Sequence, residues 1–273
     1  MYIFVFYKYR THIQMQIEFF KYQGAGNDFV MIDNRDLNFP KTNNKLVEKL
    51  CDRRFGIGGD GLILLENDSD YDFRMVYYNA DGYEGTMCGN GGRCCVAFAK
   101  QLGVINNSTN FIAVDGEHDA TIENDLVNLR MTNVDFIAEN KDHYFLDTGS
   151  PHHVEFTKDV ASIDVQTRGS EIRNGAPYFE EGTNVNFAEN LGNNTIRVRT
   201  FERGVEGETL ACGTGVTAVA ISAYKEGILD GNTVKLNVEG GKLEVSFEET
   251  ENGFENIFLK GPAEFVFRGT IES

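Results

Sequence analysis

An internal repeat divides this sequence into two similar parts. When the chain is aligned with itself, residues 88–116 match residues 212–240 without a gap. The identical pairs include Cys88 with Cys212, Gly89 with Gly213, Gly91 with Gly215, Ala99 with Ala223, Gly103 with Gly227 and Gly116 with Gly240. Two similar units, each large enough for a domain, usually pack about an approximate two-fold axis and form a pocket at their interface. The repeat therefore predicts that one cysteine from each half reaches a shared pocket.

Each copy of the repeat has the pattern of a strand, a glycine-rich loop and a helix. The expected segments are 73–78, 79–92 and 93–102 in the first copy, and 196–201, 203–215 and 216–226 in the second. Gly103 and Gly227 follow the two helices at the position where helices commonly end. Both helices are apolar on almost every face, which predicts that each lies inside a sheet or barrel. Residues 235–247 predict a hairpin around Gly240 and Gly241.

Charge and cysteine content narrow the class of partner. A net charge of -17 disfavours binding to nucleic acid or to an anionic membrane surface, so we expect a small-molecule substrate. Five cysteines with no C-x-x-C pair argue against a disulfide framework or a zinc site. The apolar run at 1–7 precedes Lys8 and Arg10, the reverse of the order in a secretory signal. We therefore expect a cytoplasmic protein with free thiols.

The repeated element suits acid–base chemistry at carbon. A cysteine just before a helix, followed by Gly-x-Gly, places its sulfur beside unpaired backbone N–H groups, which is expected to lower the pKa of the thiol. The same N–H groups can bind a substrate carboxylate. If the two elements face each other, one thiolate can remove a proton from an α-carbon while the opposite thiol delivers another. The pattern thus predicts inversion of configuration, whereas a cysteine protease would pair one cysteine with a histidine.

The sequence resembles diaminopimelate epimerase over nearly the whole chain from Met15 onward. The motifs that carry the resemblance are QGAGNDFVMIDNR (23–35), DRRFGIGGDGLI (52–63), YNADGYEGTMCGNGGRC (78–94), GSPHHV (149–154), GTNVNF (182–187) and FERGVEGETLACGTG (201–215). The resemblance implies interconversion of L,L- and meso-2,6-diaminopimelate in lysine and peptidoglycan synthesis, without pyridoxal phosphate, another cofactor or a metal. It also implies a homodimer.

The resemblance further implies an α+β fold of two pseudosymmetric domains, each a barrel-like, mostly antiparallel sheet around a central helix. The expected first domain comprises 15–131 and 261–273 and carries Cys88. The second comprises 132–260 and carries Cys212. Residues 1–14 are expected to be an extension or tail.

Site residues are carried over from the matching motifs. Cys88 and Cys212 are expected to be the acid and base, with His152 and Glu202 as further catalytic residues. The expected substrate-binding residues are Asn27, Asn79, Gly89, Asn90, Ser150, Asn184, Glu202, Arg203, Gly213 and Thr214. Ser150 departs from the family, which often has Asn at this position, and serine reaches less far.

Several of these residues also have an ordinary structural interpretation. The asparagines can close turns, Glu202 and Arg203 can form a solvated ion pair, and His152 can be a turn residue. The sequence alone leaves two rival functions open. One is a proline racemase-like or other amino-acid racemase, although the first motif of proline racemases usually has His where Asn90 stands. The other is a non-catalytic amino-acid-binding module, which has no need of two thiols.

Overall fold

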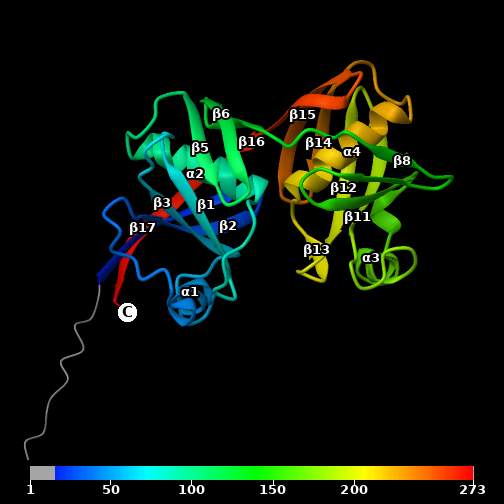
Figure 1. Cartoon of the computed structure of the whole chain (residues 1–273). Coiled ribbons are helices and arrows are strands. Elements are labelled where there is room, and N and C mark those ends of the chain that lie inside the picture. The colour runs from blue at the N-terminus through cyan, green and yellow to red at the C-terminus, as the bar shows by residue number, and fades with distance from the viewer. Residues whose placement is uncertain (1–15, 273) are drawn as a thin grey trace, which may run out of the picture.

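Two buried helices organise the fold of the computed structural model, which describes residues 16–272. Helix α2 (Gly89–Gln101) and helix α4 (Gly213–Lys225) each run through a strongly curved set of strands, and Figure 1 shows the two halves next to each other. Most residues of both helices are buried, as their apolar composition predicts. The tail expected at 1–14 lies outside the described residues. Among the helices of residues 16–272, none is long and apolar enough to cross a membrane.

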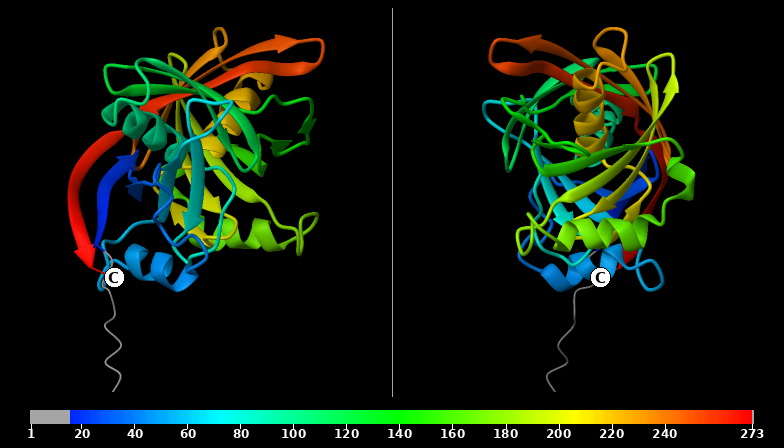
Figure 2. Two further views of the ribbon diagram at one scale, coloured as in Figure 1. Left: turned by 60° about the vertical axis from the view of Figure 1, so that its left-hand side comes forward. Right: turned by 90° about the vertical axis from the view of Figure 1, so that its right-hand side faces the viewer.

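The first half consists of eight strands. They are β1 (Gln16–Gly24), β2 (Asn27–Asp33), β3 (Gly61–Glu66), β4 (Arg74–Asn79), β5 (Ser108–Ala113), β6 (Gly116–Glu123), β7 (Leu126–Arg130) and β17 (Glu264–Glu272). Hydrogen bonds join them in the order β17-β1-β2-β3-β4-β5-β6-β7, with β2–β3 and β4–β5 parallel and the other pairs antiparallel. The C-terminal strand β17 thus lies beside β1, as the red and blue strands of Figure 2 show.

The second half repeats this order. Its strands are β8 (Ile137–Glu139), β9 (Tyr144–Asp147), β10 (Pro151–Thr157), β11 (Asn184–Gly192), β12 (Thr195–Glu202), β13 (Gly207–Thr209), β14 (Thr233–Val238), β15 (Gly241–Thr250) and β16 (Gly253–Pro262). The order β8-β9-β10-β11-β12-β14-β15-β16 has parallel pairs β10–β11 and β12–β14 at the same places, while β13 pairs with the end of β12. The two halves therefore share one strand topology, and the structural repeat extends beyond the residues that repeat in the sequence.

Strand β16 links the halves, because it pairs with β15 on one side and with β7 on the other. A shared core also runs through both, and Phe98 of α2 and Val216 of α4 belong to one cluster of buried side chains. The predicted boundaries 15–131 with 261–273, and 132–260, stay a prediction.

Outside the barrels lie α1 (Asn44–Cys51), α3 (Val165–Asn174) and the short 3-10 turn η1 (Val160–Ser162). The side chains of Asn43 and Asp164 cap the N-termini of α1 and α3. The α+β class expected from the sequence is confirmed.

Two local predictions need correction. The central helices begin at Gly89 and Gly213, earlier than the expected starts at 93 and 216. The first turn of α2 packs so closely that a larger residue has little room, since a Cβ at Gly91 would lie 3.1 Å from Ile63. Glycine fits here in spite of its low helix propensity. The predicted hairpin forms between β14 and β15, but Val238 pairs with Gly241, so its turn holds Glu239 and Gly240 rather than the two glycines.

Candidate functional site

The N-termini of α2 and α4 meet between the two halves. Cys88 and Cys212 are the N-cap residues of these helices, with extended backbone conformations. A Cβ placed on Gly213 would lie 3.5 Å from the Cα of Gly89, so the two helix starts lie close together, and the side chain of Leu259 lies beside both. The structure therefore brings the two repeated cysteines together from different halves of the chain.

Burial sets the pKa of both thiols. It raises the pKa of Cys88, although hydrogen bonds from the backbone of Gly91 and Asn90 act in the opposite direction. Burial also raises the pKa of Cys212 well above its usual value, and the nearby Glu202 carboxylate adds to this effect. The low thiol pKa expected from the helix N-termini is therefore wrong, because loss of hydration outweighs the N–H groups.

A chain of hydrogen bonds leads to Cys212. Asn186 donates its Nδ2 to the His153 carbonyl (3.0 Å), and the same amide nitrogen faces Nδ1 of His152 (3.0 Å). Nδ1 is therefore the acceptor, and the ring proton of His152 lies on Nε2, 2.9 Å from Thr214 Oγ1. The hydroxyl of Thr214 in turn lies 3.4 Å from Cys212 Sγ and can donate to it. Burial lowers the pKa of His152 to about 3, so this relay contains a neutral imidazole.

Glu202 lies on the same side of the site, at the end of β12. Thr209 donates its hydroxyl to Glu202 Oε1 (2.5 Å). Burial raises the pKa of Glu202, while hydrogen bonds with Thr209 and Cys212 act to lower it. A carboxyl group in contact with a thiol, with a raised pKa, is suited to exchanging a proton with that thiol.

Asn184 connects two other expected substrate ligands, Ser150 and Arg203. Its Nδ2 donates to Ser150 Oγ (2.7 Å) and to the Pro151 carbonyl (3.0 Å), and its Oδ1 accepts from the backbone N–H of Arg203 (2.9 Å). The Arg203 side chain is exposed and donates to the Glu181 carbonyl (2.9 Å). Ser150 thus reaches Asn184 in spite of its short side chain.

On the other side of the site, Asn27 Oδ1 lies 3.6 Å from Cys88 Sγ. Asn90 donates its Nδ2 both to Asn27 Oδ1 (3.2 Å) and to the Ala211 carbonyl (2.9 Å). The side chain of Asn90 therefore links Ala211, the residue before Cys212, to Asn27, which contacts Cys88. Arg93, fully buried, donates to Asn90 Oδ1 (3.0 Å) and holds this bridge in place.

Asn79 stands apart from this hydrogen-bond network. It is exposed at the end of β4, where it pairs with Gly61, and within residues 16–272 its side chain makes no hydrogen bond to another predicted site residue. The same described range contains no group of three or more His, Cys, Asp or Glu side chains placed to hold a metal ion.

Sequence reasoning missed four supporting residues. Two of them, Arg93 and Asn186, make the contacts given above. The other two support Asn27, whose Nδ2 donates to Asp60 Oδ2 (2.6 Å), while Arg53 donates to Asp60 Oδ1 (2.7 Å). All four lie inside motifs that carry the family resemblance, which was the available signal. Their roles depend on contacts with residues distant in sequence, so the motif letters alone did not reveal them. His153, in contrast, bonds Tyr178 and Glu155 rather than the relay.

Solved structures share this fold. A phenazine biosynthesis protein of the PhzF family from Bacillus anthracis aligns with a TM-score of 0.75 at 15% identity, covering 94% of this chain and 99% of that one. A hydroxyproline epimerase from Agrobacterium vitis aligns with a TM-score of 0.66 at 13% identity, covering 94% and 92%. These likenesses show that the chain shares the fold of these two proteins.

Sequence comparison identifies the family. A family model described as diaminopimelate epimerase matches residues 19–137 and 144–266. The diaminopimelate epimerase of Flavobacterium psychrophilum is 57% identical over 93% of this chain and 100% of its own length, and that of Chlorobaculum tepidum is 44% identical over 91% and 98%. The chain belongs to the diaminopimelate epimerase family, which confirms the family and the epimerase activity predicted from the sequence.

Proposed function

We propose that Cys88 and Cys212 are the two bases that convert L,L-diaminopimelate to meso-diaminopimelate. The observation that carries this proposal is the meeting of the two helix N-termini, each capped by a cysteine. The substrate's α-carbon lies between the sulfurs, and its carboxylate is held by the first-turn N–H groups that follow Gly89 and Gly213. These donors also stabilise the negative charge that develops on the carboxylate when the α-proton leaves.

The two sides of the site are suited to different protonation states. Thr214 offers a hydroxyl donor to Cys212, which favours a thiolate and makes Cys212 the base toward the L,L substrate. Asn27 offers an acceptor to Cys88, which favours a thiol and makes Cys88 the acid. Glu202 exchanges protons with Cys212 between turnovers, and His152 orients Thr214. A thiolate whose pKa is raised by burial is also a stronger base toward a weakly acidic C–H group.

The remaining predicted residues hold the rest of the substrate. We assign Asn27, Asn79, Ser150, Asn184 and Arg203 to its amino groups and distal carboxylate. The contacts among Ser150, Asn184 and Arg203 support a shared role, because they hold these polar groups in one place before substrate binds.

The test is substitution of each cysteine, followed by chromatographic separation of the stereoisomers formed from L,L-diaminopimelate. Cys88→Ala and Cys212→Ala should each abolish epimerisation while circular dichroism shows an intact fold. Cys51→Ala is the matched control, because Cys51 is a buried core residue of α1 and should retain turnover. Near-normal turnover in either of the first two variants would exclude the two-base assignment. Calorimetric binding without isomerisation in the unmodified protein would instead indicate a binding module.

We also propose that the enzyme acts in the cytoplasm, as a homodimer and without nucleic-acid or membrane partners. Five free cysteines suit a reducing compartment, and the net charge of -17 disfavours polyanionic partners. Strand β17 exposes Phe265, Val266 and Phe267, an apolar stretch suited to contact with a second copy. Light scattering after gel filtration should give twice the chain mass, and a Val266→Lys variant should shift it toward the monomer.

A further inference from the structure

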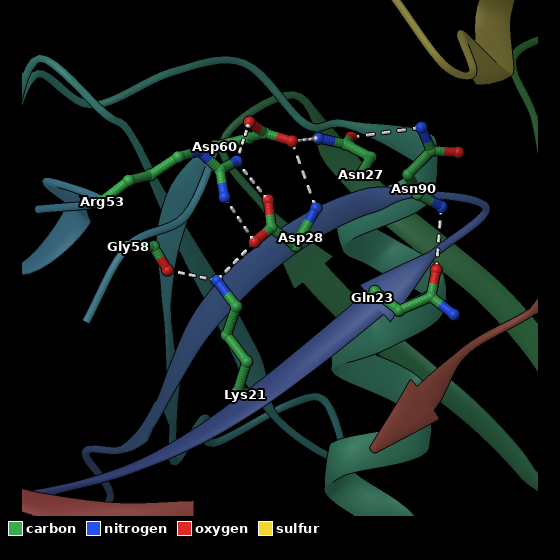
Figure 3. Close-up of polar contacts among 9 residues, drawn as sticks. Lys21, Gln23, Asn27, Asp28, Arg53, Gly58, Asp60 and Asn90 are labelled. Carbon is green, nitrogen blue, oxygen red and sulfur yellow. Dashed lines mark hydrogen bonds and ion pairs between the residues drawn. The ribbon is translucent and has the colours of Figure 1, made fainter. Parts of the chain in front are cut away.

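The amide of Asn27 is held between a carboxylate and the Cys88 sulfur. Its Nδ2 donates to Asp60 Oδ2 (2.6 Å), and its Oδ1 accepts from Asn90 and faces Cys88 Sγ at 3.6 Å. A carboxylate can only accept hydrogen bonds, so Asp60 requires the nitrogen of the amide to point toward it. The carbonyl oxygen must then point toward Cys88. Figure 3 shows this arrangement from Asp60 through Asn27 to Asn90.

Asp60 is itself anchored in a network of four charged side chains. Arg53 donates to Asp60 Oδ1 (2.7 Å) and to both oxygens of Asp28 (3.0 and 2.6 Å), and Lys21 pairs with Asp28 at 2.6 Å (Figure 3). Burial acts to raise the pKa of Asp28, but hydrogen bonds from Arg53 and Lys21 outweigh it and bring that pKa to about 2. The network contains two cations and two anions, so it holds Asp60 in place without a net charge.

The direction of the hydrogen bond at Cys88 has a chemical consequence. The oxygen of Asn27 can accept a hydrogen bond from an S–H group but would repel a thiolate, because its lone pairs face the sulfur. Backbone N–H groups act to lower the pKa of both thiols, and the difference lies in the side-chain neighbours, because Thr214 beside Cys212 can donate. We propose that Asp60 is a positioning residue, which acts through the Asn27 amide to keep Cys88 protonated as the acid of the pair. This inference rests on the proposed two-base function.

Other titratable and charged groups also face Cys88. They are Arg93 and Cys94 on α2, Tyr77 on β4, Glu202 on β12 and Cys212 at the start of α4. A substitution at Asp60 leaves all of them in place. Any change in the ionisation of Cys88 then comes either from the Asn27 amide or from the direct loss of the Asp60 charge, and the experiment must separate these two causes.

The test measures the rate at which iodoacetamide alkylates Cys88 in the enzyme without substrate. Mass spectrometry follows each cysteine peptide from pH 6 to 10, a range of about four units around the ordinary thiol pKa of about 8.5. In Asp60→Asn, the new NH2 group competes for the oxygen of Asn27 and draws it away from the sulfur. At a fixed pH below the pKa of Cys88, the rate of its alkylation should rise by about threefold to tenfold. This rise corresponds to a decrease of roughly half to one unit in the pKa of Cys88. The Cys212 profile should not change.

Two variants identify the cause. Asn27→Ala removes the acceptor and should by itself raise Cys88 alkylation; in this background Asp60→Asn should have no further effect. A full Asp60→Asn effect in the Asn27→Ala background would mean that charge acts directly and would overturn the proposal. The matched control is Asp33→Asn, which breaks the Asp33–Arg35 ion pair (2.6 Å) at the other end of β2 and should leave Cys88 unchanged.

An unchanged Cys88 profile in both Asp60→Asn and Asn27→Ala would also overturn the inference. The proposed function fails in a different way, namely by turnover in Cys88→Ala or Cys212→Ala. The two failures are therefore distinguishable, because alkylation reports the protonation of Cys88 whether or not the enzyme turns over. Asn27→Ala also keeps the inference testable if Asp60→Asn does not fold.

Discussion

The relay that ends at Cys212 can be broken with little change in shape by Thr214→Val. Valine has nearly the volume of threonine but no hydroxyl, so it removes the 3.4 Å contact to Cys212 Sγ and the 2.9 Å partner of His152 Nε2. Both effects act on the side of the site that we assign to the base. The variant therefore tests whether the hydroxyl favours the thiolate or only fills space.

The expected magnitudes follow from these contacts. A hydrogen bond to a charged group contributes about 1.5 to 3 kcal/mol, which corresponds to a loss of roughly tenfold to a hundredfold in kcat/KM. Leaving the buried N–H group of His152 without a partner should lower the free energy of unfolding by about 1 to 3 kcal/mol. Burial is the main cause of the raised pKa of Cys212, and Thr214 opposes it. Without the hydroxyl this pKa should rise further, so the ascending limb of kcat/KM should move to higher pH.

The assay measures initial rates by chromatography of the stereoisomers across the pH range, together with urea unfolding. Thr217→Val is the matched control: Thr217 is buried one turn further along α4 and donates to the Gly213 carbonyl (2.9 Å). This control should lose some stability but keep the position of the pH limb. Equal pH profiles in Thr214→Val and the unmodified enzyme, with no loss of kcat/KM, would refute the relay.

Three further results are expected. Because burial lowers the pKa of His152 to about 3, protonation of this residue favours the unfolded state. The free energy of unfolding should therefore fall by about 1.4 kcal/mol per pH unit between about pH 6.5 and pH 3. Urea titrations should show a shallower fall in His152→Gln, and equal slopes would contradict the assignment. Gly240→Ala should strongly reduce thermal stability and turnover, because its Cβ would lie 1.8 Å from the Ala25 carbonyl, while Gly207→Ala has room; similar melting temperatures would refute this packing. Air oxidation should join the two site cysteines in a disulfide, faster at high pH because burial raises the pKa of both, and peptide mapping that finds free thiols would contradict it.

The fold could be predicted from the sequence because the two halves keep identical residues at positions where packing permits few others. The repeated pair Gly91 and Gly215 leaves little room for a side chain, since a Cβ would lie 3.1 Å from Ile63 and 2.4 Å from Asn186, and the small apolar residues of α4 fit the interior of a barrel. The sequence predicts too late a start for each central helix, because glycine has a low helix propensity. The first turn of a helix nevertheless tolerates glycine.

The electrostatics of the site could not be read from the sequence. The helix N-termini suggested low thiol pKa values, but burial of Cys88 and Cys212 reverses the sign, and burial depends on the assembled halves. The support of Asn27 by Asp60 joins β2 to the residue before β3 and is a tertiary contact. Motif order indicated which residues matter, whereas their hydrogen-bond directions required the structure.

The most direct test of the two-base mechanism is the reaction of L,L-diaminopimelate in deuterated water, with the deuterium content of each stereoisomer measured by mass spectrometry at early times. Two bases from opposite halves predict deuterium at the inverted α-carbon of the meso product, because Cys88 delivers a solvent-derived proton. The recovered L,L substrate should stay mostly protiated, because Cys212 still carries the proton that it has just removed. A meso product that retains the substrate's own α-hydrogen would contradict the account, since it would mean that one base serves both faces.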